Sequence, residues 1–145
     1  AEQAATVFIF QYLIGNTDWS LVTNDEDETC CHNGDLVDVG TDRYYVPYDF
    51  DLAGLVNARY ARPDPSLRIR KVTQRRYRGF CIPKEALESA LSKIMARRAD
   101  IMDIISHLPG LSEKEIAVTT RYVDKFFAGA SNTDKLLASF ERKCL

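Results

Sequence analysis

The chain lacks the sequence features of a membrane span and of a zinc site. No apolar run is long enough to cross a bilayer, and no basic region precedes the apolar stretch from Thr6 to Ile14, as a signal peptide would require. The four cysteines show no C-x-x-C spacing, and only two histidines are present. The sequence therefore indicates neither a structural nor a catalytic zinc site.

The composition is that of one globular domain, or of part of a larger one. The chain has 145 residues, of which 46% are hydrophobic and 28% charged. A net charge of -2 argues against general nucleic-acid binding, but the charges are segregated into an acidic run at 25–28 and a basic run from Arg68 to Arg78. Such runs are ordinarily exposed faces, although the basic one could also meet phosphate groups or a polyanion. The chain begins at Ala1 rather than Met, so a mature form, an excised piece and a fragment all stay open.

The first half of the chain predicts a helix followed by a hairpin. Apolar density from residue 4 to 14 predicts a buried helix, with a strand as the alternative, and Gly15-Asn16 ends it. A polar, exposed stretch follows. Alternating residues at 35–39 and 43–48 around a Gly40-Thr41-Asp42 turn predict a β-hairpin. Because its second strand is apolar up to Asp49, we expect that strand to be buried.

The second half predicts an irregular segment and then helices. Pro63 and Pro65 interrupt residues 52–80, whose aromatic end, 77–80, is expected to dock on the core. Helical spacing runs from Pro83 to Leu108, and Pro109-Gly110 stops it. Ser112-x-x-Glu115 is a capping box that starts another helix, which Gly129 ends, and 132–143 forms the last. The predicted fold class is α+β and mostly helical.

Cysteine and aromatic positions have ordinary structural interpretations. Cys30-Cys31-His32 could gather soft metal ligands, but loop thiols with one distant disulfide are the simpler interpretation, and the sequence does not say which of the four cysteines would pair. Trp19 is expected to plug the core under the Asp18 loop. His32 is expected to orient Asn33 or a loop carbonyl rather than bind metal, and His107 to cap a helix or face solvent.

Four polar residues flank the hairpin and could carry chemistry. Asp18 follows the first helix, Asn33 precedes the hairpin, and Asp49 and Asp51 end it. Phosphoryl transfer needs one carboxylate to position the attacking hydroxyl or take its proton, and an Asn and an Asp to hold magnesium. Hard oxygen ligands of this kind suit Mg²⁺.

The motifs Gly15-Asn16-Thr17-Asp18, His32-Asn33 and Asp49-Phe50-Asp51 carry a family resemblance. Over roughly residues 5 to 55 the chain resembles the catalytic half of the protein-kinase-like fold, in the form of atypical bacterial kinases similar to spore-coat protein H (CotH) and the HipA type. The resemblance implies a kinase C-lobe-like helical domain with Asp18 as base and Asn33, Asp49 and Asp51 as metal ligands on the hairpin. It also implies Mg²⁺ and ATP as cofactors and a protein as a possible substrate.

The chain departs from this family pattern in two places. The acidic insertion separates Asp18 from Asn33, and Asn24 lies closer to the usual interval, but Asn33 directly enters the hairpin. No Gly-rich loop and no strand Lys are present to hold nucleotide phosphates. We therefore expect residues 1–145 to be the C-terminal lobe of a longer protein, with 1–55 as the catalytic region, 56–82 as an irregular basic segment and 83–145 as a helical bundle. A separate N-terminal lobe would bind the nucleotide.

Three functions remain as hypotheses. The first is the catalytic lobe of a magnesium-dependent, kinase-like phosphotransferase. The second is a non-catalytic protein-interaction module, in which the run from Arg68 to Arg78 docks an acidic partner. The third is a metal-dependent phosphoester hydrolase with Asp49 and Asp51 as ligands and Asp18 as base.

Overall fold

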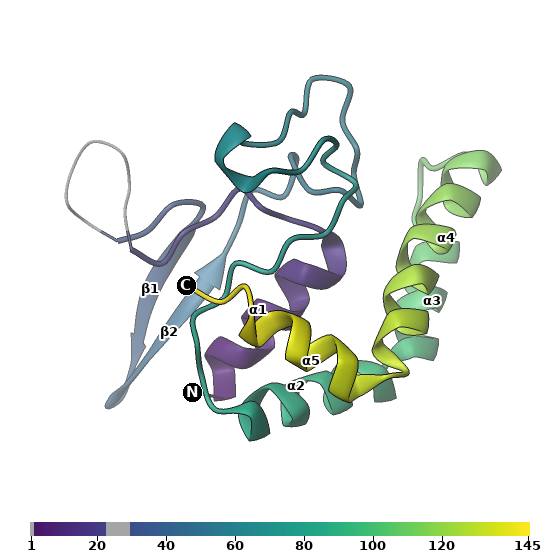
Figure 1. Ribbon diagram of the computed structural model, residues 1–145. Helices are drawn as coiled ribbons and strands as arrows, with labels where there is room; N and C mark the ends of the chain where they lie inside the picture. Colours follow the sequence, from purple (N-terminus) through teal and green to yellow (C-terminus); the bar gives the residue numbers. More distant parts are fainter. Residues whose placement is uncertain (1, 23–29) are drawn as a thin grey trace.

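The computed structural model describes residues 2–22 and 30–145, and over these it shows an α+β fold of five α-helices and one antiparallel hairpin (Figure 1). The acidic run and Asn24 lie outside the described residues. The elements are α1 (Glu2–Ile14), β1 (Gly34–Val39), β2 (Asp42–Pro47), a 3-10 turn (Pro65–Leu67), α2 (Lys84–Ala96), α3 (Arg98–Ser106), α4 (Glu113–Ala130) and α5 (Thr133–Glu141). None of the described helices is both long and apolar enough to cross a membrane.

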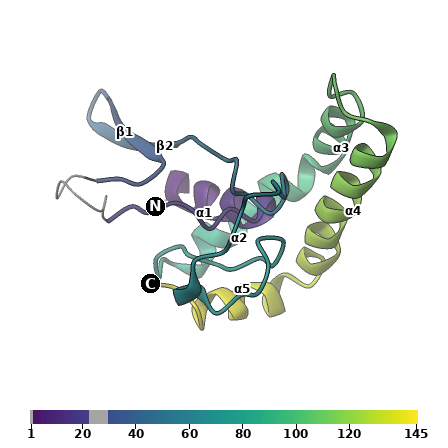
Figure 2. The same cartoon turned by 90° about the horizontal axis from the view of Figure 1, so that it is seen from above.

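Helix α1 is the centre of the fold, as its apolar sequence predicted. It lies between the hairpin and α4, and α2 packs against it (Figure 2). Its buried side chains point in several directions rather than to one side, which is typical of a helix with neighbours all round. Phe8 stacks on Trp19 at 5.7 Å between ring centroids, and Trp19 is 3% exposed, which confirms it as a core residue.

The hairpin is exposed, and the prediction that its second strand is buried is wrong. Gly40, with a φ of 64°, and Thr41 form the turn between the strands. On β2 only Tyr45 is buried, while Val46 is 48% exposed. One face of the hairpin contacts α1, and no described element covers the other (Figure 2). An apolar strand sequence therefore did not signal burial, because a two-stranded sheet needs a partner on each face to be buried.

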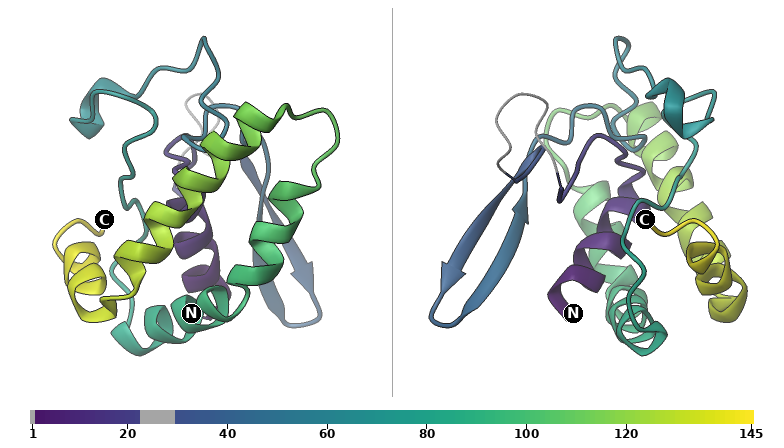
Figure 3. Two further views of the ribbon diagram at one scale, coloured as in Figure 1. Left: turned by 90° about the vertical axis from the view of Figure 1, so that its right-hand side faces the viewer. Right: turned by 60° about the vertical axis from the view of Figure 1, so that its left-hand side comes forward.

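The C-terminal helices follow the predicted order with two differences. The predicted helix from Pro83 to Leu108 is split at Arg97 into α2 and α3, and this break turns α3 alongside α4 (Figure 3). The Ser112 capping box is present. Gly129 does not end its helix, because α4 continues to Ala130 and Ser131 occupies the C-cap.

Between residues 56 and 82 the chain forms one turn of 3-10 helix and no α-helix or strand, and side chains hold this segment on the core. The Tyr77 ring is buried and stacks on Phe140 at 4.2 Å. The half-buried Arg75 guanidinium donates hydrogen bonds to the carbonyl oxygens of Leu13 at 3.0 Å and Tyr122 at 2.7 Å. It therefore ties the end of α1 to α4. The unpaired carbonyls at the C-terminal end of α1 favour a positive charge at this position.

The four cysteines form two pairs among the described residues. Cys81 and Cys144 are bonded across 63 residues and join the irregular segment to the end of the chain, which is the distant disulfide that the sequence left unassigned. Cys30 and Cys31 are bonded to each other.

Candidate functional site around Asp18

The Asp18 loop begins where α1 ends. Gly15 adopts a left-handed φ of 68°, and the backbone of Gly54 lies directly against it. Asn16 is 1% exposed, and its side-chain oxygen accepts a hydrogen bond from the Asp18 amide at 3.0 Å. This local turn, which Asn favours, fixes the backbone before Asp18.

Both carboxylate oxygens of Asp18 have partners. Oδ1 lies 3.0 Å from His32 Nε2, and Oδ2 accepts a hydrogen bond from Asn33 Nδ2 at 2.9 Å. The same Asn33 nitrogen donates to the Asp18 carbonyl at 2.8 Å. The structure thus brings two of the predicted site residues into direct contact. It also shows that His32 orients the carboxylate of Asp18, rather than Asn33 or a loop carbonyl as we expected.

Asn33 is held rigidly at the entry to the hairpin. Its φ is 52°, a left-handed value that Asn tolerates better than most residues. Its carbonyl accepts hydrogen bonds from the Tyr48 amide and the Tyr45 hydroxyl, each at 3.1 Å. Within the described residues, no donor bonds its side-chain Oδ1, so this oxygen is available to a cation.

The turn with Asp49 and Asp51 is attached to the same loop through the backbone. Asp49 directly follows Tyr48, whose amide bonds Asn33. A few residues later the Gly54 amide donates to the Gly15 carbonyl at 3.0 Å. Asp49, like Asn33, has a left-handed φ, 54°, and its carboxylate has no hydrogen-bond partner in the described part of the chain.

Asp51 is placed differently from the other predicted site residues. Its Oδ2 accepts a hydrogen bond from the Tyr60 hydroxyl at 2.8 Å. That bond, with the negative charges of Asp51 and Asp49, raises the pKa of Tyr60. Over residues 2–22 and 30–145, no three His, Cys, Asp or Glu side chains lie close enough together to hold a metal. The predicted role of Asp51 as a ligand therefore stays a prediction.

Two arginines that the sequence did not single out line the cavity beside Asp18. This cavity, of about 300 Å³, also includes Thr17 and Asp64. Arg78 donates a hydrogen bond to the Thr17 carbonyl, and Arg62 also lines the cavity. Burial lowers the pKa of Arg78, whereas Asp64 and Asp18 act in the opposite direction. A basic run in the sequence could not reveal which arginines turn toward Asp18.

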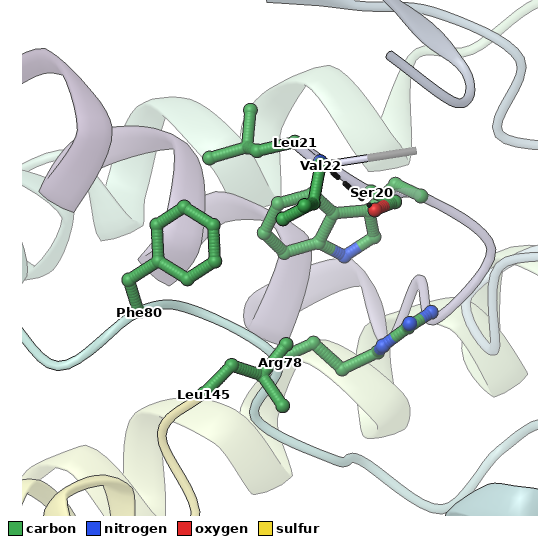
Figure 4. Close-up of a pocket in the computed structure, with 7 residues that line it drawn as sticks. Ser20, Leu21, Val22, Arg78, Phe80 and Leu145 are labelled. Carbon is green, nitrogen blue, oxygen red and sulfur yellow. Dashed lines mark hydrogen bonds between the residues drawn. The ribbon is translucent and has the colours of Figure 1, made fainter. Parts of the chain in front are cut away.

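A second hollow, next to residues 19–22, is too small for a ligand. Arg78, Phe80 and Leu145 line it opposite Leu21 and Val22 (Figure 4). Its volume is about 10 Å³, which is close to the space that a single water needs. The candidate site is therefore the cavity that contains Asp18, Arg62 and Arg78.

Comparisons of the chain with protein families, with curated proteins and with solved structures find no match. The functional argument consequently depends on the residues themselves.

Proposed function

We propose that this chain is the catalytic lobe of an atypical kinase-like phosphotransferase. The observation that carries the proposal is the contact of the Asp18 carboxylate with the Asn33 amide. The base and one magnesium ligand expected from the family resemblance would be these two residues. The Asp49 turn, anchored to Asn33 through Tyr48 and to Gly15 through Gly54, supports the same arrangement.

The described oxygen atoms are compatible with Mg²⁺. The Asn33 Oδ1 and the Asp49 carboxylate are both without hydrogen-bond donors in the described part of the chain, and both are ligand types that Mg²⁺ prefers. A bound Mg²⁺ would neutralise charge on the transferred phosphoryl group. Asn33 and Asp49 would hold it, while Asp51 is already bonded to Tyr60.

Asp18 is proposed to bind the acceptor hydroxyl and to take its proton as the hydroxyl oxygen forms its bond to phosphorus. His32 and Asn33 hold the two carboxylate oxygens and so fix its orientation. Arg62 and Arg78 line the same cavity, and their positive charges suit a phosphoryl group. The chain offers no Gly-rich loop and no strand Lys for nucleotide phosphates, so we assign ATP binding to a separate lobe.

Metal binding by the chain itself tests the first part of this proposal. Mn²⁺, used as a spectroscopic substitute for Mg²⁺, should bind the wild-type chain in electron paramagnetic resonance titrations and be displaced by Mg²⁺. Asp49→Asn should weaken binding by about tenfold or more, since a ligand charge is lost. The matched control is Asp42→Asn, an exposed aspartate at the start of β2, whereas Asp49 follows the end of that strand. Equal affinities in the two variants would refute Asp49 as a ligand.

Phosphotransfer tests the second part, in whatever longer protein or complex supplies the nucleotide lobe. Asp18→Asn should lower the transfer rate by about a hundredfold or more while leaving nucleotide affinity unchanged, because it removes only the base. Retained activity in this variant would refute the assignment of Asp18 as the catalytic base. Mg²⁺-dependent hydrolysis of a simple phosphate ester by the chain alone, without nucleotide, would instead identify a hydrolase.

A further inference from the structure

Three hollows that share lining residues follow one another from Asp18, and together they are called the track. The Asp18 cavity shares Arg62 and Pro63 with a second cavity of about 560 Å³. That cavity shares Asn57 and Thr73 with a groove of about 620 Å³. The irregular segment and the turn between α3 and α4 lie at the same end of the molecule (Figure 3, left). The track runs along this end.

All of the charged residues that line the middle cavity are positive. Four exposed cations line it, and no acidic residue does. They are Arg59, Arg62, Arg70 and Lys71. Among the described residues, none of the four forms an ion pair with a carboxylate. Like charges held together repel one another, so this cavity favours an anionic occupant.

Hydrogen bonds fix the backbone that carries these cations, and they also fix the guanidinium of Arg62. The Gln74 side-chain oxygen accepts hydrogen bonds from the amides of Arg70 at 2.6 Å and Lys71 at 3.0 Å. Arg62 donates to the carbonyl oxygens of Arg59 at 3.0 Å and Ala61 at 2.8 Å. The loops are thus organised before any ligand arrives, which lowers the entropy lost on binding.

The far end of the track is apolar. The groove exposes 55% of Val56, 42% of Leu108 and 46% of Val118, and Tyr122 also lines it. Lys114 and Glu115 stand among its polar residues. Several large apolar side chains gathered in one groove are typical of a surface that binds apolar side chains of a partner.

We propose that this track binds the phosphoryl acceptor, and that the acceptor is a polypeptide segment with apolar residues beside acidic ones. The apolar groove would bind the apolar residues, and the cationic cavity the acidic ones. The hydroxyl to be phosphorylated would reach Asp18 by passing Arg62, which lines both the cationic cavity and the Asp18 cavity. The inference depends on the proposed function, and it adds the class of substrate. The groove disfavours nucleic acid, whose backbone offers no aliphatic side chains.

Fluorescence anisotropy with a labelled peptide, a run of leucines followed by a run of glutamates, tests the track. The double variant Arg70→Glu/Lys71→Glu should weaken binding by about tenfold or more, with a loss that shrinks as salt rises. The double variant Lys135→Glu/Arg142→Glu changes the net charge equally at exposed residues of α5 and its C-cap that do not line the track, and it should alter affinity less than about twofold. Val118→Lys should weaken binding of the leucine peptide but not of a version with serines in place of leucines.

The outcomes separate the track from the catalytic proposal. Equal losses in the two charge variants, or displacement of the peptide by inorganic phosphate or by single-stranded DNA at the same charge concentration, would overturn the track. If the peptide binds as expected, but wild-type protein with its nucleotide lobe transfers no phosphate to a version of the peptide that carries one added serine, the phosphotransferase proposal fails and the track stands as a binding surface.

Discussion

The helices after residue 83 and the irregular segment 56–82 use positive charge in different ways. In the helices, four cations pair with carboxylates across or along the surface: Lys84 with Glu88 and Asp134, Lys93 with Glu2, Arg97 with Asp100, and Arg98 with Asp124. The region 57–78 instead holds eight Lys and Arg residues and a single acidic residue, Asp64. Among the described residues, none of these eight forms an ion pair.

The difference follows from how each region satisfies its backbone. A helix bonds its own amides and carbonyls, so its charged side chains are left for surface pairs that each contribute little, about 0–1 kcal/mol. The irregular segment has no such ladder, and Arg75 ties it to the helices by donating to their carbonyls. Arg62 and Arg78 also donate to backbone carbonyls, but none of the cations of the segment is neutralised by a paired carboxylate among the described residues, which is why the segment rather than the bundle provides the candidate binding track.

Arg75→Ala should cause the largest loss of stability, because Arg75 joins the irregular segment to the helices. It would leave the Leu13 carbonyl at the end of α1 without a donor and remove the tie to Tyr122, so we expect the free energy of unfolding to fall by about 3 kcal/mol. The matched control is Arg76→Ala, one residue along, whose side chain makes no hydrogen bond in the described chain and whose loss should change stability by about 0.5 kcal/mol or less. Urea denaturation measures both. Similar losses in the two variants would show that Arg75 does not tie the segment down, and Arg75→Lys should fall between them.

Glycine-to-alanine changes should have opposite signs in the two regions. A Cβ on Gly54 would lie 2.5 Å from the Val72 carbonyl and 3.0 Å from the Thr73 Cα, both backbone atoms, so we expect a loss of about 2 kcal/mol. A Cβ on Gly129 in α4 meets nothing within 4 Å, and the helix should gain about 0.5–1 kcal/mol. Thermal unfolding of the two variants measures the signs. A stabilising Gly54→Ala would mean that Val72 and Thr73 of the segment are not pressed against Gly54.

Alkaline pH should loosen the contact of the segment with α5. Burial raises the pKa of Tyr77 in the folded state above its unfolded value, so the folded state favours the neutral phenol. The contribution is therefore complete below about pH 10 and is lost as pH rises further. Tyr77→Phe should cost under about 1 kcal/mol at neutral pH, because its hydroxyl lies a long 3.5 Å from the Phe80 carbonyl.

The same Tyr77→Phe variant should lose less stability than the wild type between neutral and strongly alkaline pH. Tyr48→Phe, a change at an exposed hairpin residue, is the control and should follow the wild-type curve. Denaturant midpoints measured across the alkaline range test this expectation. Identical slopes for wild type and Tyr77→Phe would show that another group governs the alkaline loss.

Local signals in the sequence predicted the order of the elements. The buried helix, its end at Gly15, the hairpin turn and the Ser112 capping box all depend on neighbours within a few residues. The break at Arg97 and the exposure of β2 were missed, because both depend on which distant surfaces are present to pack against. The candidate site shows the same contrast between what was predicted from the sequence and what was not. Asp18 and Asn33 were expected as a pair, whereas the roles of His32, Arg62 and Arg78 beside Asp18 were not.

The sequence by itself determined the helices, the hairpin and the residues that could carry phosphoryl-transfer chemistry, since these follow from periodicity, turn residues and side-chain chemistry. Only the tertiary structure decided what each charge does. Arg75 and Arg70 belong to the same basic run, yet one is half-buried against helix carbonyls and the other is exposed in an open cavity. That distinction depends on residues far apart in the chain, which no local pattern records.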